Sequence, residues 1–249
     1  MILKGRHFIV TRQIEQGQEL LEKLVSMGAT STLIPCLDFR EPDSCTLLEQ
    51  ALSELSSFEL IAFTSANGVR FFFQYLKKRN IPLTRLQSFT FACVGPKTSK
   101  TLQDLGLRAN ITADKHIAEG LSASIEAYFG GCLLKRKVLL PQAQIARGVL
   151  LQRLTDLGAH VVKVPCYKTV CPTSLPAAYQ TLDRNATLLF SSPSAVTNWV
   201  KLTKDVERCC YCIGPVTAKA AQKEGFKILQ VATTHTVEGL LDALHVEGK

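Results

Sequence analysis

Short apolar runs alternate with amphipathic stretches along the chain. The first run, HFIVT (7–11), is rich in β-formers, and the next stretch places Leu20, Leu24 and Met27 at helical spacing until Gly28 ends it. The same rhythm continues through both halves of the sequence. Strands that alternate with helices predict parallel sheets covered by helices on both faces. We therefore expect an α/β fold.

The sequence also contains a long internal repeat. VGPKTSKTLQDLGL (94–107) and IGPVTAKAAQKEGF (213–226) share Gly, Pro, Thr, Lys, Gln and Gly without a gap. Further pairs of segments correspond in the same order: 7–39 with 137–169, 62–73 with 189–200, and 113–125 with 233–244. This self-similarity predicts two domains related by internal duplication, each a doubly wound parallel sheet.

Two segments that contain Pro-Cys, TLIPCLDFREP and HVVKVPCYKTVCP, occupy equivalent places in the repeat and are longer than the neighbouring strands. We expect them to pair as a two-stranded β-ladder over about 33–42 and 162–171. Domain one would then comprise 1–36 and 170–249, and domain two would comprise 43–164. The alternative is two consecutive domains that divide near residue 130, and periodicity alone does not choose between them.

Hydroxyl residues stand where strands run into helices. Thr98 and Thr217 fall in the first helical turn after the two Gly-Pro pairs, and Ser65 and Ser192 fall at N-cap positions after two other strands. Helix N-termini bind anions, and in open α/β sheets they line the crevice at the carboxyl ends of the strands. Plain capping explains any single turn, whereas the doubled set indicates an anion-binding cleft between two domains.

No sequence motif indicates that this anion is a nucleotide phosphate. Neither G-x-x-x-x-G-K-[ST] nor G-x-G-x-x-G occurs, the nucleophile elbow G-x-S-x-G is also missing, and the histidines show no i, i+4 pairing for a metal. The chemistry would therefore rest on hydroxyls, backbone N–H groups and positive charge. Tyr167, in KVPCYKTV, is the candidate whose phenol would face the cleft. The alternative is a partly buried strand tyrosine without a chemical role.

Composition limits the classes of binding partner and the cellular compartment that we expect. The net charge of +8 suits an anionic partner, although a generally basic surface is the simpler explanation. Aromatic residues are not interleaved with Lys and Arg, so we expect no nucleic acid. Nine scattered cysteines form no disulfide framework, and we expect Cys209 and Cys212 to be core thiols. No apolar run approaches the ~20 residues of a membrane span, and no signal peptide is visible. We expect a cytoplasmic protein without a membrane partner.

The chain resembles the uroporphyrinogen-III synthase family in several stretches that follow the family's order: FTSANGVRFFF, VGPKTSKTLQDLG, VPCYKTV, LLFSSPSAV, IGPVTAKAAQKEG and the closing HTVEGLLDAL. The resemblance implies two α/β domains joined by a two-stranded ladder, with domain one built from both termini. It implies cyclisation of hydroxymethylbilane, a linear tetrapyrrole with eight carboxylates. Water is lost and the last pyrrole ring is inverted, giving uroporphyrinogen III without a cofactor or metal.

The resemblance also implies roles for individual residues. Tyr167 matches the tyrosine of the family's V-Y-x-T pattern, the usual candidate for assisting departure of the substrate hydroxyl. The implied substrate-binding residues carry hydroxyl or basic side chains near strand ends: Arg12, Ser65, Thr98, Arg147, Ser192 and Thr217. A monomer and transient contact with the preceding enzyme of the pathway are further expectations. The residues alone leave one alternative open, a non-catalytic bilobed binding protein for a polyanionic small molecule.

Overall fold

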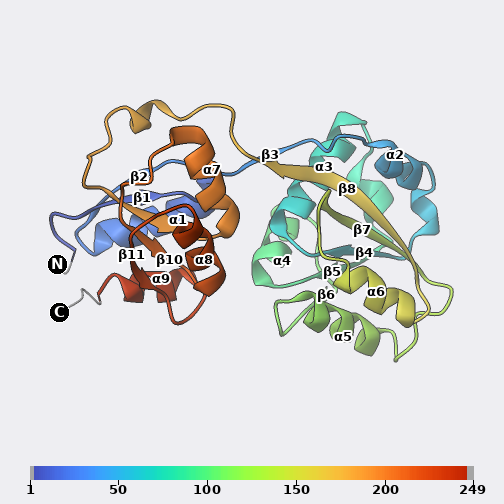
Figure 1. The fold of residues 1–249 in the computed structure, drawn as a ribbon. Coiled ribbons are helices and arrows are strands. Elements are labelled where there is room, and N and C mark those ends of the chain that lie inside the picture. The colour runs from blue at the N-terminus through green and yellow to red at the C-terminus, as the bar shows by residue number, and fades with distance from the viewer. Residues whose placement is uncertain (1–2, 246–249) are drawn as a thin grey trace. The chain divides into compact units, whose positions relative to one another are not determined.

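The chain forms two compact α/β units, shown in Figure 1. The computed structural model describes residues 3–245. The first unit combines the chain up to Asp38 with the chain from Val170 onward, and the second unit extends from Phe39 to Thr169. Each unit has its own sheet and its own core, so each is described by itself.

The first unit is a five-stranded sheet with helices on both faces. Its strands lie in the order β11-β10-β9-β1-β2, and all their pairings are parallel. Leu20 of α1 and Leu240 of α9 pack on one face, and Trp199 of α7 packs on the other. The elements are β1 (His7–Val10), α1 (Ile14–Ser26), β2 (Thr30–Leu33), β9 (Thr187–Phe190), α7 (Pro193–Thr203), β10 (Cys210–Cys212), α8 (Pro215–Lys223), β11 (Ile228–Val231) and α9 (Val237–Ala243).

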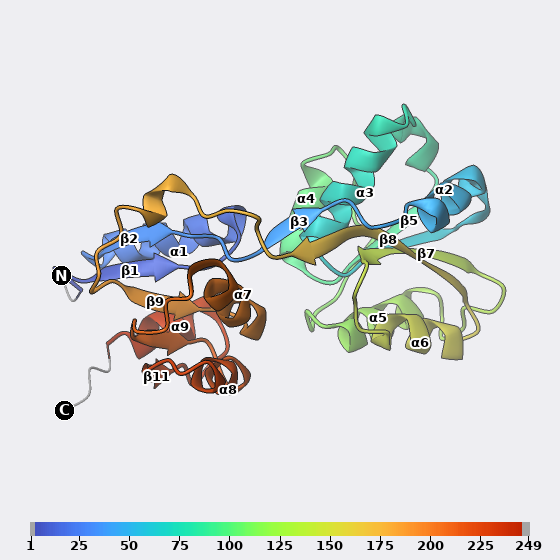
Figure 2. The same ribbon diagram turned by 45° about the horizontal axis from the view of Figure 1, so that its top comes forward.

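The second unit is a six-stranded sheet in the order β3-β8-β7-β4-β5-β6. Figure 2 shows α5 and α6 on one side of this sheet and α2, α3 and α4 on the other, and the two core clusters divide in the same way. The elements are β3 (Asp38–Arg40), α2 (Thr46–Ser53), β4 (Leu60–Phe63), α3 (Ala66–Lys78), β5 (Thr90–Cys93), α4 (Pro96–Gln103), β6 (Ile111–Thr112), α5 (Ala118–Tyr128), β7 (Lys137–Ala143), α6 (Val149–Asp156) and β8 (His160–Val170). Short 3₁₀ turns occupy Leu55–Ser57, Leu83–Leu86 and Ala177–Tyr179.

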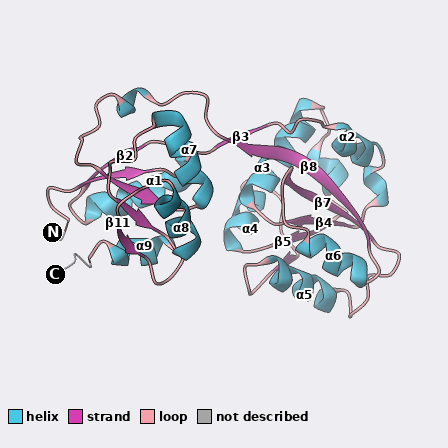
Figure 3. Cartoon of the chain, viewed as in Figure 1, coloured by secondary structure: helices cyan, strands magenta, loops and turns pink. Residues whose placement is uncertain are grey.

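The two sheets share one spatial order of strands. The first unit reads β2-β1-β9-β10-β11, and the second reads β8-β7-β4-β5-β6 beyond its edge strand β3. Both are the 2-1-3-4-5 order of flavodoxin-like sheets, with the β7–β8 pair moved to the end of its unit in the chain. Figure 3 shows parallel strands covered by helices in both units, so the predicted α/β class is confirmed. The duplication stays a prediction, which this correspondence supports.

The expected long strand over 33–42 is not continuous. β2 ends at Leu33, and β3 begins only at Asp38. Pro35 lies in the gap and Pro42 follows β3, and a proline donates no hydrogen bond to a sheet. The second expected strand is present as β8, and β3 lies beside it at the edge of the second sheet. The ladder as a joint between two domains, and the predicted domain limits, stay predictions.

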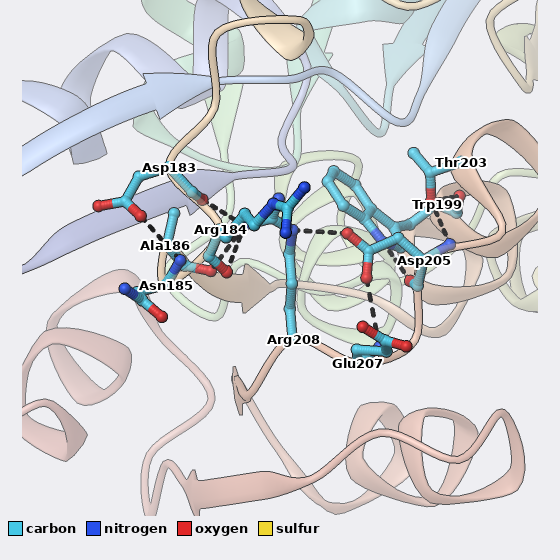
Figure 4. A network of polar contacts seen from close by, with 9 residues as sticks. All are labelled: Asp183, Arg184, Asn185, Ala186, Trp199, Thr203, Asp205, Glu207 and Arg208. Atoms are coloured by element: carbon cyan, nitrogen blue, oxygen red, sulfur yellow. Dashed lines mark hydrogen bonds and ion pairs between the residues drawn. The ribbon is translucent and has the colours of Figure 1, made fainter.

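A partly buried polar network lies before β10 in the first unit (Figure 4). Arg208 Nε donates to Asp205 Oδ2 at 2.6 Å, and Arg208 Nη1 donates to the carbonyls of Asp183, Arg184 and Ala186 at 2.6, 3.2 and 3.3 Å. Trp199 Nε1 donates to the Asp205 carbonyl at 2.8 Å. The Arg208 side chain is only 10% exposed, so its charge is satisfied by the protein rather than by water.

Candidate active site

The candidate residues gather at the carboxyl edge of each sheet. All strands of a parallel sheet end at the same edge, so the segments that follow them share that edge. In the second unit these segments carry Ser65 after β4, Thr98 after β5 and Arg147 after β7, and Tyr167 lies opposite the last residue of β7. In the first unit they carry Arg12 after β1, Ser192 after β9 and Thr217 after β10.

Tyr167 and Ser65 are in direct contact. The Tyr167 hydroxyl lies 3.2 Å from Ser65 Oγ, and Ser65 Oγ accepts a hydrogen bond from the Gly68 N–H at 3.0 Å. Ser65 is the N-cap of α3, which fixes its rotamer and therefore the side of the phenol that it meets. Within each unit, no other two of the predicted site residues in the described part of the chain share a hydrogen bond.

A β-bulge orients Tyr167. Gln142 pairs with Pro165 but Ala143 pairs with Tyr167, so Cys166 is an extra residue in β8. The bulge lets Cys166 and Tyr167 join the same buried cluster, although neighbouring strand residues ordinarily alternate faces. The phenol stacks on Phe71, with ring centroids 5.2 Å apart, and forms a T-shaped pair with Phe39, with ring centroids 5.5 Å apart.

Burial controls the acidity of Tyr167. The side chain is 7% exposed, and burial raises the pKa of its phenol. The hydrogen bond with Ser65 opposes this rise in pKa, and the neighbouring Cys166 adds to it. Desolvation disfavours the phenolate, whereas a donated hydrogen bond stabilises it. The group thus stays protonated at neutral pH, with a partner placed to stabilise the charge left when the proton departs.

Thr98 and Thr217 occupy equivalent places in the two units. Each is the third residue of a helix that begins with proline after an extended glycine, and the residues are 4% and 3% exposed. Arg147 is exposed and lies just before α6, whose N-cap is Gly148. Thr98 and Arg147 therefore lie at the same sheet edge as Tyr167 but do not bond to it.

Ser192 and Arg12 lie at the edge of the first unit. Ser192 is the N-cap of α7 and accepts a hydrogen bond from the Ala195 N–H at 3.2 Å, and its hydroxyl meets Ser194 Oγ at 3.1 Å. Arg12 is half-buried and donates from Nη2 to Gln16 Oε1 at 3.3 Å. Burial lowers the pKa of its guanidinium, and the carboxylate of Glu19 opposes this.

Sequence reasoning missed two histidines. A Cβ at Gly95 would lie 3.0 Å from Cγ and Cδ2 of His116, and a Cβ at Gly214 would lie 2.8 Å from Cδ2 of His235. Each imidazole therefore lies over the glycine of a Gly-Pro-x-Thr turn, and a side chain at that glycine would require the ring to shift. The available signal was their equal spacing: both stand three residues before a Glu-Gly pair.

The described part of the chain offers neither a metal site nor a membrane-spanning helix. Among the described side chains, which are those of residues 3–14 and 16–245, no group of three or more His, Cys, Asp or Glu is placed to hold a metal ion. In the same part of the chain, no helix has the length and apolar character needed to cross a membrane.

The fold and the site together define a class: an α/β protein of two parallel-sheet units that carry hydroxyl and basic side chains at their carboxyl edges. The chain belongs to the uroporphyrinogen-III synthase family, because the family described as "Uroporphyrinogen-III synthase HemD" matches residues 18–242.

Individual relatives agree with this assignment. The uroporphyrinogen-III synthase of Synechococcus elongatus is 27% identical, over 97% of this chain and 95% of that protein. A porphyrin biosynthesis protein HemD of Ruminiclostridium josui is also 27% identical, and the chain spans about half (48%) of its length. The crystal structure of the Helicobacter pylori uroporphyrinogen-III synthetase aligns with a TM-score of 0.63 at 20% identity, over 95% of this chain and 97% of that one, which shows the shared fold.

Proposed function

We propose that this protein is a uroporphyrinogen-III synthase and acts as a lyase. It takes hydroxymethylbilane, loses water, inverts the last pyrrole ring and forms uroporphyrinogen III. The observation that carries the proposal is the contact between Tyr167 and Ser65 at a carboxyl edge, in a chain that the family matches over 18–242.

Tyr167 acts as the general acid for the leaving hydroxyl. The pyrrole nitrogen of the first ring pushes electrons toward its hydroxymethyl carbon, the C–O bond breaks, and the phenol protonates the departing hydroxide to give water. The Ser65 hydroxyl stabilises the phenolate by donating to it across their 3.2 Å contact. The raised pKa of Tyr167 keeps the required proton on the phenol before reaction.

Ring inversion needs positioning more than chemical catalysis. The substituted carbon of the last ring attacks the azafulvene, and the resulting spiro intermediate fragments and recloses. The flexible substrate must be held with its two ends in reacting geometry, and its carboxylates provide the handles. We assign them to the basic side chains Arg12 and Arg147, to the hydroxyls of Ser192, Thr98 and Thr217, and to the N–H groups of the adjoining helices.

The identity of the product isomer tests this function. Freshly made hydroxymethylbilane is incubated with the protein and, in parallel, with buffer alone, and the isomers are separated after oxidation to porphyrins. Spontaneous closure gives isomer I, so we expect isomer III only with the protein. Isomer I alone in both samples would contradict the proposal. If the substrate is bound but not converted, the protein is instead a binding protein for a polyanionic small molecule.

A further inference from the structure

Each unit presents a histidine over the turn that begins a helix at its carboxyl edge. His116 follows β6 and His235 follows β11, and both residues are exposed. Their rings lie over Gly95 and Gly214, which are the N-cap residues of α4 and α8. The ring nitrogen Nε2 of His235 is only 3.0 Å from the position that a Cβ of Gly214 would take. An imidazole and a helix start therefore meet in the same way in both units.

The loops that carry the two histidines are held tightly by the chain itself. A Cβ at Gly120 would lie 2.1 Å from the carbonyl oxygen of Lys115, and a Cβ at Gly239 would lie 2.2 Å from that of Thr234. Each loop thus packs on the first turn of the helix that follows it, so closely that a larger residue would force the backbone to shift. The backbone position of each histidine is fixed before any ligand arrives, which lowers the entropy cost of binding.

The turns beneath the histidines contain unused hydrogen-bonding groups. Thr98 and Thr217 are 4% and 3% exposed, yet neither hydroxyl has a hydrogen-bond partner in the described chain. Neither oxygen is among the fully enclosed unpaired side-chain atoms of that part of the chain, so both hydroxyls reach the surface. The N–H groups of Lys97 and Val216, the second residues of α4 and α8, also lack a backbone acceptor there. An unpaired hydroxyl on an almost buried residue indicates a partner that arrives from outside.

The chemistry of these groups selects an anion as that partner. Each turn offers a threonine hydroxyl, a backbone N–H and the N–H of an imidazole, and all three can donate. The start of the helix adds partial positive charge. The acidic residues nearest in the chain, Asp114, Glu119 and Glu238, form no hydrogen bond or ion pair with either ring in the described structure. A carboxylate has two oxygens and can accept from two or three such donors at once.

We infer that His116 and His235 are substrate-binding residues, and that each donates a ring N–H to one substrate carboxylate held at the turn below it. The inference rests on the proposed function, because that substrate carries eight carboxylates. It adds one imidazole to each Gly-Pro-x-Thr turn, at positions that neither a motif nor the family resemblance indicated. Each unit then has its own three-donor carboxylate site.

A substrate analogue that cannot react tests the inference by binding alone. The probe is the methylbilane, in which a methyl group replaces the hydroxymethyl group, so that it keeps the eight carboxylates but cannot lose water. Dissociation constants are measured for wild type and for His116→Phe and His235→Phe. Phenylalanine keeps a flat ring over the glycine and removes the N–H donors.

Two other exposed histidines provide matched controls, one in each unit. His160 begins β8, and His245 follows the end of α9, where the Leu244 carbonyl accepts from Arg6 just before β1. Both therefore lie at the amino edge of their sheets, away from the helix starts. His160→Phe and His245→Phe are titrated with the same probe. The ring Cε1–Hε1 NMR signals of all four histidines are followed in wild type, and the signal missing from each variant assigns them.

We expect His116→Phe and His235→Phe each to weaken binding about tenfold, because a hydrogen bond to a charged group is lost. The two control variants should bind like wild type, and all four should melt near the wild-type temperature. In wild type, the probe should shift the ring signals of His116 and His235 and leave those of His160 and His245 unchanged.

Absence of saturable binding, unshifted signals of His116 and His235 at saturation, or Phe variants at these positions that bind like wild type would each overturn the inference. Isomer analysis is a separate readout. Wild type that forms isomer III while these two signals do not shift refutes this inference alone. Shifted signals and weakened variants without isomer III refute the proposed function and leave two carboxylate sites.

Discussion

Two pairs of positions that the internal repeat aligns carry different side chains in the two units. The gapless repeat aligns Tyr167 with Leu37 and Phe71 with Asn198. In the second unit the tyrosine packs between two phenylalanine rings and bonds to the cap serine of the next helix. In the first unit Leu37 lines a cavity, and Asn198 Nδ2 donates to the Cys36 carbonyl at 2.7 Å.

The two cap serines have nearly the same backbone in both units, whereas Tyr167 lies within β8 and Leu37 lies after the end of β2. Ser65 and Ser192 cap their helices with φ/ψ values of −162°/152° and −163°/155°, and each accepts one N–H from three residues ahead. Equal caps with different neighbouring side chains indicate that the two units carry different tasks. We expect the second unit to supply the chemistry at Tyr167 and the first unit to supply binding.

The largest expected effect concerns the segments that precede β10 in the first unit and β5 in the second unit. Arg208→Ala should lower the free energy of unfolding by about 1.5–3 kcal/mol, because Asp205 and three carbonyls lose a charged, mostly buried hydrogen-bond partner. Arg79→Ala in the second unit is the matched control. Its ion pair with Glu49 has side chains 52% and 48% exposed, so the loss should stay below about 1 kcal/mol. Urea titration of both variants gives the comparison, and equal losses would contradict it.

The raised pKa of Tyr167 sets a pH dependence. The phenol acts in its protonated form, and burial moves its pKa upward, so turnover should stay level through neutral pH. Above the raised pKa, turnover should fall about tenfold per pH unit as the proton is lost. Rates are corrected for spontaneous closure at each pH. A fall that begins below the ordinary tyrosine range, near pH 10, would show that another group is the acid.

The two cap serines should differ in activity but not in stability. Ser65→Ala and Ser192→Ala each remove a capping hydrogen bond, which costs about 1 kcal/mol of stability. Ser65 lies within hydrogen-bond distance of the Tyr167 hydroxyl, so Ser65→Ala should also lower kcat about 2–10-fold, whereas Ser192→Ala should change only KM. Steady-state kinetics and thermal melts separate the two effects. An equal fall of kcat in both variants would remove the distinction between the units.

The smallest effects are expected at Thr98 and Thr217, which have the same residue type and the same place in the two units. Thr98→Val and Thr217→Val keep the shape of a buried side chain and remove one hydroxyl. Each should raise KM about 2–10-fold, the equivalent of a neutral hydrogen bond, because the neighbouring backbone N–H groups remain. A tenfold or greater difference between the two variants would show that the equivalent turns have unequal tasks.

Several features of the fold and the site could be predicted from the sequence because they are local. Ser65 and Ser192 follow apolar runs and precede helical patterns, and both are N-caps in the structure. The partner of Tyr167 could not be predicted, because it lies 102 residues away and depends on strand order. The bulge at Cys166 could not be predicted either, since regular side-chain alternation places neighbouring residues on opposite faces of a strand.

Pro35 was a visible reason for a break in the strand before Asp38. The prediction of one continuous strand rested instead on the length of the segment that the repeat aligns with β8. The cavity that Leu37 lines has no sequence signature, because its lining comes from segments far apart in the chain. Local chemistry was therefore predictable, whereas the contacts set by sheet order were not.

Steady-state kinetics of Tyr167→Phe tests the central claim most directly. The change removes one oxygen and keeps the ring between Phe39 and Phe71, so folding should be preserved. Tyr128→Phe, on an exposed tyrosine of α5, controls for the substitution itself. We predict that kcat for isomer III falls about 10²–10⁴-fold in Tyr167→Phe while KM and the melting temperature stay near wild type. Turnover close to that of wild type would remove Tyr167 from the mechanism.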